Sequence, residues 1–502
     1  MRLKISARKS DLARLQAYMV GETLKENNPG LEIEYRFKES LGDINLTTPL
    51  WQIPEKGVFT EDFLGELIHG ETDMVVHSWK DLPTEARKDT EIVATLPRAD
   101  QRDLLLVKKS HFAKLRSEKA MRVFSSSPRR EYNLTNFFKE HLPFNLESVK
   151  FESVRGNIPT RIRKLLESTE VDGLIVAKAA LDRLFTVPQD EFKEVQALLR
   201  SYLAQVEFAA LPLSVNPNAA AQGALAIEIK KDRADLRALL GKIDDPSTFK
   251  CAQKERDILA SFGGGCHQKI GVAVLARPYG EITILKGLTD GGKVLDTREL
   301  VPSTPAPRFS AEQMWSSEVR AERKPLNDWK VPAGTNALYV SRSESWPEGL
   351  KFDQFVWTAG TRTWKAMAQK GVWVHGCSEG LGEQEESRIN ILANVPLKWA
   401  KLTHDTGYEE GARQMPLVAT YTLGAQNNAL PVTGKECFFW SSGSQFLDTA
   451  KKHPEILNKH HACGPGNTFK IIRQYLQEQN LFDESKLNIY LDLENWRQQC
   501  TK

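Results

Sequence analysis

The sequence lacks the long apolar segments and the charge excess that mark several common classes of protein. Within its 502 residues, no apolar run reaches the length of about 20 residues that a membrane span needs. The first residues, MRLKISARKSDLARLQ, lack the apolar core of a signal peptide. The net charge of +3 is too balanced to indicate bulk binding of nucleic acid. We therefore expect a cytoplasmic, monomeric protein that binds neither membranes nor nucleic acids.

The sequence also lacks the cysteine pairs that hold zinc or carry out thiol exchange. None of the six cysteines forms a C-x-x-C pair, so we expect no metal site. In a reducing cytosol they should be free thiols, and most should be small buried side chains. The six are Cys251, Cys266, Cys377, Cys437, Cys463 and Cys500. Cys266 differs from the others because three glycines directly precede it.

What the sequence does have is the composition and the periodicity of a multidomain α/β protein. Its hydrophobic content of 41% and charged content of 26% are ordinary for globular chains. Its length exceeds the limit of about 300 residues for a single core. Strand and helix patterns alternate through residues 1–230, which predicts mostly parallel sheets covered by helices.

Changes of pattern along the chain predict four domains. We expect an α/β domain from residues 1–96 and 221–241, and a second α/β domain from 102–203. Residues 246–320 combine a helix with alternating strands, which indicates a small α+β domain with antiparallel hairpins. Residues 335–502 return to an α/β pattern, and we expect the charged stretch Glu318–Lys330 to be a linker.

Arginines of the first 200 residues stand next to turn residues, where predicted strands end. In open α/β sheets, ligands bind at the carboxyl ends of the strands, and the guanidinium fork binds carboxylates in bidentate fashion. Convergence of these arginines on one cleft would indicate a ligand with many carboxylates or phosphates. The alternative is a set of scattered surface arginines. The set comprises Arg8, Arg129, Arg130, Arg155, Arg161 and Arg183.

Two further segments carry candidate chemistry. Asp81, with Lys80 beside it, follows the apolar strand Asp73–His77, and an acid in that place can exchange protons with a reacting nitrogen. The alternative for Asp81 is a helix cap or a salt bridge. The sequence Gly263-Gly264-Gly265-Cys266 is either a covalent attachment point or a turn with an incidental thiol.

These segments belong to ten short motifs that together resemble those of porphobilinogen deaminases. Each motif alone is common, but here all ten occur in the family's order within residues 1–320. They are Arg8 to Ala13, Gly42-Asp43, Lys56 to Phe59, His77 to Pro83, Arg102-Asp103, Ser125 to Arg130, Arg155 to Arg161, Gln222 to Leu225, Glu255-Arg256 and Gly263 to Cys266.

The resemblance implies a fold, a cofactor and a reaction. It implies two periplasmic-binding-protein-like α/β domains and a third α+β domain carrying a dipyrromethane cofactor, joined by a thioether to Cys266. The substrate would be porphobilinogen, and Asp81 would protonate its departing amine, releasing ammonia. Four additions followed by hydrolysis would give hydroxymethylbilane. A primer extended by four substrates would bear about twelve carboxylates, which accounts for a cleft rich in arginine.

The same resemblance assigns roles to further residues. Those expected to bind the cofactor and the growing chain are Lys80, Ser126, Ser127, Arg129, Arg130, Arg155, Arg161 and Arg183. Those expected to bind the substrate are Arg8, Ser10, Lys56, Phe59 and Gln222. Phe59 would stack on pyrrole rings, or else pack as ordinary core at a helix start. The chain departs from the family at Leu41, Ala221 and His267-Gln268-Lys269, which puts loop geometry and kinetics in doubt rather than reaction type.

Residues 335–502 resemble uroporphyrinogen-III synthase, which closes hydroxymethylbilane into a macrocycle. The resemblance lies in strands that end in Ser or Thr before a helix start. It involves Ser341, the segment Val356 to Thr363, the strand residue Tyr421, Ser441-Ser442, and Cys463 to Thr468. The alternative is a deaminase whose C-terminal domain only docks or stabilises. A further alternative, from another class, is a bilobed binding protein or sensor without catalysis.

Overall fold

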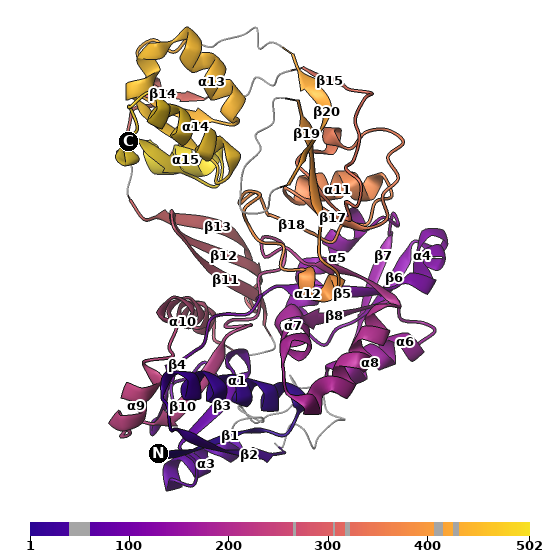
Figure 1. Cartoon of the computed structure of the whole chain (residues 1–502), viewed down its shortest axis with the longest axis vertical. Helices are drawn as coiled ribbons and strands as arrows, with labels where there is room; N and C mark the ends of the chain where they lie inside the picture. Colours follow the sequence, from indigo (N-terminus) through magenta and orange to yellow (C-terminus); the bar gives the residue numbers. More distant parts are fainter. Residues whose placement is uncertain are drawn as a thin grey trace. The chain divides into compact units, whose positions relative to one another are not determined.

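The chain forms two compact mixed α/β units in a computed structural model (Figure 1). The first unit contains Met1–Lys139, Phe144–Leu275 and Ile284–Thr297, and the second contains Glu140–Pro143, Ala276–Thr283 and Arg298–Lys502. The structure describes residues 1–39, 61–264, 268–304, 307–316, 322–405, 415–424 and 431–501.

The first sheet of the N-terminal unit has the strand order β2-β1-β3-β10-β4. Its strands are β1 (Arg2–Arg8), β2 (Glu32–Lys38), β3 (Met74–Ser78), β4 (Thr90–Ala94) and β10 (Leu225–Lys230). Its helices are α1 (Asp11–Asn27), α3 (Glu61–His69) and α9 (Ala234–Leu240). Alternating apolar residues of the strands form one buried core with the inner face of α1, for example Ile5, Val20 and Ile227. Strand β3 confirms the apolar strand expected at Asp73–His77, with a shift of one residue.

The second sheet repeats the arrangement of the first, with the strand order β7-β6-β8-β5-β9. Its strands are β5 (Asp103–Lys108), β6 (Ala120–Phe124), β7 (Ser148–Glu152), β8 (Gly173–Ala177) and β9 (Val206–Ala210). Its helices are α4 (Phe112–Glu118), α5 (Pro128–His141), α6 (Ile158–Glu167), α7 (Lys178–Thr186) and α8 (Lys193–Leu203), with 3₁₀ turns η3 (Lys109–His111) and η4 (Asp190–Phe192).

Both sheets are mixed rather than mostly parallel, which corrects the expectation. In each sheet the strand in fourth place is antiparallel to its neighbours: β10 to β3 and β4, and β5 to β8 and β9. These are the two strands that the chain enters on crossing between sheets, from β4 into β5 and from β9 into β10. A strand reached without a helical crossover is free to enter its sheet in the opposite direction.

A helix and a three-stranded sheet follow, as the sequence predicts. Helix α10 (Pro246–Ser261) begins at Asp245, whose side chain accepts a hydrogen bond from the Thr248 amide. The sheet has the order β11-β12-β13 and consists of β11 (Lys269–Arg277), β12 (Gly280–Leu288) and β13 (Val294–Pro302).

The second unit contains two further sheets. One has the order β15-β20-β19-β16-β17-β18, and the other has the order β14-β21-β22-β23 with all its neighbours parallel. The strands are β14 (Met314–Ser316), β15 (Arg323–Pro325), β16 (Ala337–Val340), β17 (Phe355–Thr358), β18 (Gly376–Cys377), β19 (Trp399–His404), β20 (Leu417–Leu423), β21 (Cys437–Trp440), β22 (His460–Cys463) and β23 (Leu487–Ile489). The α-helices are α11 (Thr361–Gln369), α12 (Asn390–Ala393), α13 (Gly443–Lys452), α14 (Asn467–Glu478) and α15 (Leu493–Cys500). The 3₁₀ turns are η5 (Ala311–Gln313), η6 (Ser343–Ser345), η7 (Pro454–Asn458) and η8 (Glu484–Lys486).

The stretch expected to be a linker contributes a strand to the C-terminal sheets. Strand β15 pairs with β20, and β14, just before it, pairs with β21. Trp315 on β14 is 5% exposed, and its ring lies 4.9 Å from that of Trp440, measured between centroids. The linker prediction at Glu318–Lys330 is therefore wrong for Arg323–Pro325, because a short strand at a sheet edge shows little apolar periodicity of its own.

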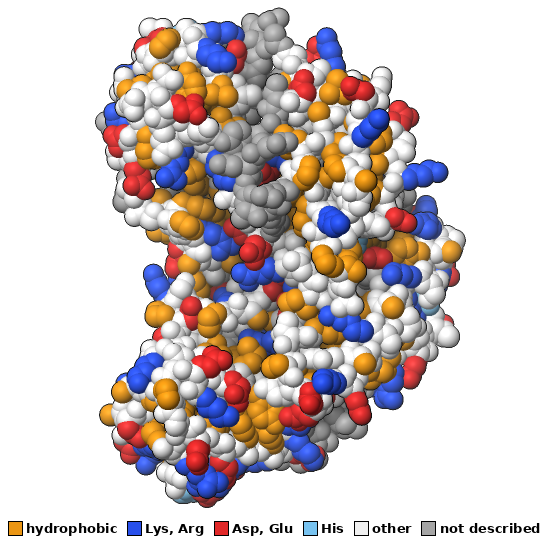
Figure 2. All heavy atoms as spheres, viewed as in Figure 1, with side chains coloured by type: hydrophobic (Ala, Val, Ile, Leu, Met, Phe, Trp, Pro, Cys, Tyr) orange, Lys and Arg blue, Asp and Glu red, His pale blue; other side chains and the backbone are white. Residues whose placement is uncertain are grey.

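The surface agrees with the balanced composition. Lysine and arginine side chains are interspersed with acidic ones over the visible face (Figure 2). Among the described residues, no helix combines the length and apolar character that a membrane crossing requires.

Replacing Trp315 by alanine tests whether β14 belongs to the C-terminal core. Loss of a buried indole leaves a cavity beside Trp440, so we expect the free energy of unfolding of the C-terminal unit to fall by about 3 to 5 kcal/mol. Calorimetry or urea denaturation of the full chain measures this change. The control is Leu481→Ala, at a side chain that is 37% exposed, where we expect a much smaller loss. A loss for Trp315→Ala no larger than that of the control would show that β14 does not belong to the C-terminal core.

Candidate functional site

Asp81 lies in a short 3₁₀ turn at the carboxyl end of β3. The turn, η2 (Trp79–Asp81), is anchored by the fully buried Trp79, whose amide donates to the Ala224 carbonyl at 3.1 Å. Asp81 itself is exposed. The neighbouring Lys80 ammonium donates to Gln222 Oε1 at 3.0 Å. Burial lowers the pKa of Lys80, whereas the Asp81 carboxylate raises it. The turn thus presents a carboxylate to solvent next to a cation.

Arg256 of α10 holds the backbone of this turn. Its Nη1 atom donates to the carbonyls of Trp79 at 3.2 Å and Leu82 at 3.1 Å, and its Nη2 atom donates to that of Pro83. Burial lowers the pKa of Arg256 to about 10. The sequence marks Arg256 only as part of a motif, and its contact with the Asp81 turn is visible only in three dimensions.

The same helix leads toward the cysteine. After α10, Gly263 and Gly264 have φ values of 97° and 65°, which side chains rarely adopt. A Cβ atom at Gly264 would lie 2.5 Å from Thr84 Oγ1, so the glycine backbone passes directly against the segment that follows Asp81. Cys266, and likewise Lys56 and Phe59, lie outside the described residues.

Glu255, next to Arg256, holds the segment that contains Ala221. Its carboxylate is fully buried and binds Arg98 Nη2 at 2.6 Å and the Ala221 amide at 2.8 Å. Ala221 has a φ of 64°, a left-handed conformation that costs a residue with a Cβ about 1 kcal/mol or more. The hydrogen bond that the Ala221 amide donates to Glu255 holds Ala221 in this conformation.

Asp103 binds two of the predicted arginines at once. Its fully buried carboxylate accepts from Arg129 Nη2 at 2.8 Å and from Arg130 Nη2 at 2.6 Å. It also accepts from Asn216 Nδ2 at 2.8 Å and from Gln222 Nε2 at 3.0 Å. Burial alone would raise the pKa of Asp103, but the two guanidinium groups hold it well below its usual range.

Arg129 is held inside the protein. It is 4% exposed, and its Nη1 atom donates to Asn216 Oδ1 at 2.9 Å and to the Pro217 carbonyl at 2.6 Å. These contacts favour a role in positioning neighbouring groups over direct contact with a ligand.

Arg161 is close enough to Arg130, Arg155 and Asp81 for their charges to influence it. Burial lowers the pKa of Arg161 to about 10, with further lowering from Arg130 and Arg155 and an opposing effect from Asp81. Burial also lowers the pKa of Arg183 to about 10. The Arg183 Nη2 atom donates to the Gly223 carbonyl at 2.6 Å, while its buried Nε atom has no hydrogen-bond partner. This surplus of buried positive charge suits a ligand with several carboxylates.

The predicted serines lie at the starts of helices or in the loops before them. The Ser126 hydroxyl exchanges hydrogen bonds with the Val154 amide and carbonyl, each at 3.0 Å. The Ser127 hydroxyl accepts from the Arg130 amide at 3.5 Å. Ser10 is the N-cap residue of α1, directly after β1 and Arg8. Ser126 and Ser127 therefore shape the loops around Arg130, while Arg8 and Ser10 follow β1, the neighbour of β3.

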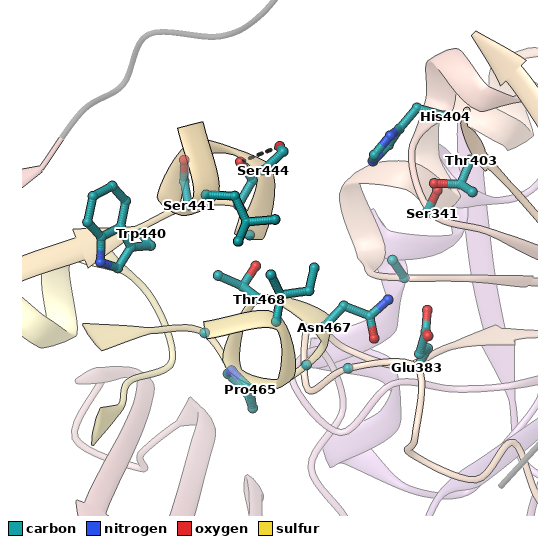
Figure 3. Close-up of a pocket in the computed structure, with 18 of the residues that line it drawn as sticks. Ser341, Glu383, Thr403, His404, Trp440, Ser441, Ser444, Pro465, Asn467 and Thr468 are labelled. Atoms are coloured by element: carbon teal, nitrogen blue, oxygen red, sulfur yellow. Dashed lines mark hydrogen bonds between the residues drawn. The ribbon is translucent and has the colours of Figure 1, made fainter. Parts of the chain in front are cut away.

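A separate cavity of about 960 Å³ lies within the C-terminal unit. Its walls come from both C-terminal sheets, with Ser341, Thr403, His404 and Glu383 on one side and residues of α13 and α14 on the other (Figure 3). The sequence singles out these lining residues: Ser341, Ala359, Tyr421, Ser441, Ser442, Gly464, Pro465, Gly466, Asn467 and Thr468. Residues from distant segments, selected on sequence pattern alone, thus line a single cavity.

Comparisons with known proteins identify the N-terminal part. Residues 3–238 match the family model described as porphobilinogen deaminase, dipyromethane cofactor binding domain. Porphobilinogen deaminase of Syntrophomonas wolfei is 33% identical over 286 residues, which cover 57% of this chain and 84% of that protein. That of Caldicellulosiruptor saccharolyticus is 35% identical over 272 residues, covering 54% and 83%. YhfZ of Shigella flexneri, a solved structure, covers 53% of this chain and 92% of its own at 14% identity, with a TM-score of 0.25.

Replacing Asp103 by asparagine tests the buried network. Two guanidiniums would lose their carboxylate, so we expect the free energy of unfolding to fall by about 3 to 5 kcal/mol at pH 7. The pKa of Asp103 is lower in the folded protein than the value of about 3.9 in the unfolded chain, so its contribution is complete above that value and is lost as pH falls. The difference between wild type and variant should therefore narrow below about pH 4. The control is Asp190→Asn, at an exposed pair with Lys193. A pH-independent difference would contradict the ionic network.

Proposed function

The chain belongs to the porphobilinogen deaminase family, and we propose that it joins four porphobilinogen molecules into hydroxymethylbilane, with Asp81 as the proton-transferring group. The reaction takes up one water and releases four molecules of ammonia. The observation that carries this proposal is the exposed carboxylate of Asp81 at a strand end, within electrostatic reach of Lys80 and Arg161. An acid flanked by cations suits a substrate that has both an amine and carboxylates.

The N-terminal half contains the dipyrromethane cofactor-binding domain. When bound, dipyrromethane supplies the pyrrole carbon to which substrate units are joined. Cys266 would hold the cofactor through a thioether. The glycine backbone just before Cys266 passes against Thr84, beside the Asp81 turn, which supports attachment near the acid. The positive charges near Asp81 fit the carboxylates of such a group. They are those of Arg130, Arg155, Arg161 and Arg183 and of the Lys80 ammonium.

Each residue near Asp81 has a distinct part in the proposed reaction. Asp81 donates a proton to the departing amine and afterwards accepts one from the ring carbon that has formed the new bond. Arg130, Arg155 and Arg161 bind acetate and propionate groups, and Arg8 with Ser10 binds those of the incoming substrate. Gln222 bridges Lys80 and Asp103, which fixes the ammonium relative to the arginines. Arg256 holds the turn, so that Asp81 keeps one position through four additions.

The two N-terminal sheets support an arrangement of three deaminase domains. Their common strand order, with the crossing strand antiparallel in each, fits two periplasmic-binding-protein-like domains. We place the first at residues 1–96 and 221–241, extend the second from 102 to Ala210 to include β9, and end the third before Phe309. The C-terminal domain then begins at Phe309, which forms a β-bridge with Thr501.

The second candidate activity is that of uroporphyrinogen-III synthase, in the C-terminal cavity. The specific observation is that Ser341, Tyr421, Ser441 and the segment 464–468 all line one cavity. A cavity of about 960 Å³ is of a size that takes a large organic ligand. A synthase in the same chain would receive hydroxymethylbilane before it cyclises spontaneously to the other isomer.

Two substitutions test the deaminase proposal. Asp81→Asn should reduce kcat by about 100-fold or more, because the amide cannot transfer the proton, while the cofactor remains attached. Cys266→Ser should give protein that lacks the mass of dipyrromethane and has no turnover. Mass spectrometry and the rate of porphobilinogen consumption measure both effects.

The matched control is Asp89→Asn, at an exposed carboxylate after the same turn, with unchanged turnover expected. Near-normal turnover of Asp81→Asn would reject Asp81 as the proton-transferring group. Unaltered activity of Cys266→Ser would reject the tethered primer, and ligand binding without turnover in the wild type would favour a binding protein.

Product analysis tests the synthase activity. The purified chain is incubated with porphobilinogen alone, and the oxidised uroporphyrin isomers I and III are separated. We expect mostly isomer III. Mostly isomer I would show that the C-terminal domain does not act as a synthase.

A further inference from the structure

A buried ion pair lies in the wall of the C-terminal cavity. The Lys401 Nζ atom of β19 is 2.6 Å from Glu383 Oε2, and the two side chains are 5% and 7% exposed. Both residues line the cavity, and Figure 3 shows Glu383 on the same side as Ser341 and Thr403. Neither residue belongs to a motif that the sequence marks.

Removing two charges from water costs free energy that a single ion pair often fails to recover. A buried ion pair of this kind therefore contributes little to the free energy of unfolding. An ammonium group has three hydrogen-bond donors, and Glu383 is its one ion-pair partner among the described residues. The remaining donors of the Lys401 ammonium group can therefore bind a ligand in the cavity.

Charge is distributed unequally around the cavity. Arg342 lines the wall that contains Lys401, and burial lowers the pKa of the adjacent His404, with further lowering from Lys401 and Arg342. The opposite wall carries Asp448 and Glu478 on α13 and α14 together with Lys451, and Asp448 pairs with Lys452 at 2.8 Å. An anionic group entering the cavity is therefore attracted to the Lys401 side, where Arg342 adds a second cation.

We propose that Lys401 binds a carboxylate of a linear or cyclic tetrapyrrole in this cavity, and that Glu383 orients its ammonium group and moderates its charge. The proposal rests on the synthase function proposed above, because that function supplies the ligand class. Binding at one wall fixes which end of the ligand meets Ser341 and Thr403. Glu383 keeps the affinity low enough for the ligand to leave.

The test measures binding of uroporphyrin III, a stable octacarboxylate, to the full-length chain by fluorescence titration. Titrations are run in an Arg161→Gln background, which weakens binding in the arginine-rich cleft of the N-terminal unit. Glu383→Gln keeps a hydrogen-bond acceptor but removes the negative charge, so we expect binding about three- to tenfold tighter. The double variant Lys401→Gln with Glu383→Gln leaves no unpaired charge and should bind about tenfold more weakly than Glu383→Gln alone.

The matched control is Glu436→Gln, which breaks an ion pair with Lys459; the two residues directly precede β21 and β22 and do not line the cavity. This variant should bind like the background protein. The difference between Glu383→Gln and the double variant should shrink at high salt, because it is electrostatic. Lys401→Arg keeps the positive charge and should still bind uroporphyrin III. A loss of binding in the double variant then reflects the lost charge and not a failure to fold.

The outcomes separate this inference from the synthase proposal. If Glu383→Gln and the double variant bind like the control, the role of Lys401 is rejected, even where the wild type produces isomer III. If binding follows the expected order but no isomer III forms, the carboxylate site stands and the synthase activity is rejected.

Discussion

The buried carboxylate of Asp103 binds two guanidiniums and two side-chain amides, and the N-terminal site depends on this arrangement. Arg129 and Arg130 come from α5, whereas Asn216 and Gln222 come from the segment that returns to the first sheet. One charge thus joins both sheets at their carboxyl ends. Arg130 is thereby placed beside Arg161, and Gln222 reaches Lys80. If Asp103 were neutral, the guanidinium groups of Arg129 and Arg130 would repel each other and move apart. The arrangement of side chains around Asp81 would then be lost.

Helix α10 has a comparable role on the other side of Asp81. Its residues Glu255 and Arg256 hold the Ala221 amide and the carbonyls around Asp81, and its C-terminal end continues into the glycines before Cys266. The position of the acid and the start of the cysteine loop are therefore set by one rigid element.

The sequence predicts much of this organisation because chemistry and periodicity are local. Asp81 is recognisable because it follows a strand that the sequence predicts at Asp73–His77 and that the structure places at Met74–Ser78. The roles of Asp103 and Arg256 could not be predicted, since the hydrogen bonds of Asp103 with Asn216 and of Arg256 with Trp79 join residues 113 and 177 positions apart. Strands β14, β15 and β18 have two or three residues each and are defined by their neighbours alone. The Lys401–Glu383 pair could not be predicted either, because neither residue belongs to a motif that the sequence marks.

The two sites use positive charge in different ways, and the difference follows from what each must do. Around Asp103 two guanidiniums share one carboxylate, and Arg161 and Arg183 add further positive charge nearby in the N-terminal unit. In the proposed reaction, strong binding of a polyanion would do no harm, because the growing chain would be covalently attached and would leave only by hydrolysis. A ligand of the C-terminal cavity would have no such tether and would have to dissociate by itself. In the proposed site Glu383 moderates the cation at Lys401, and the facing wall carries Asp448 and Glu478 together with Lys451. Charge balance thus distinguishes a site that retains its ligand from one that releases it.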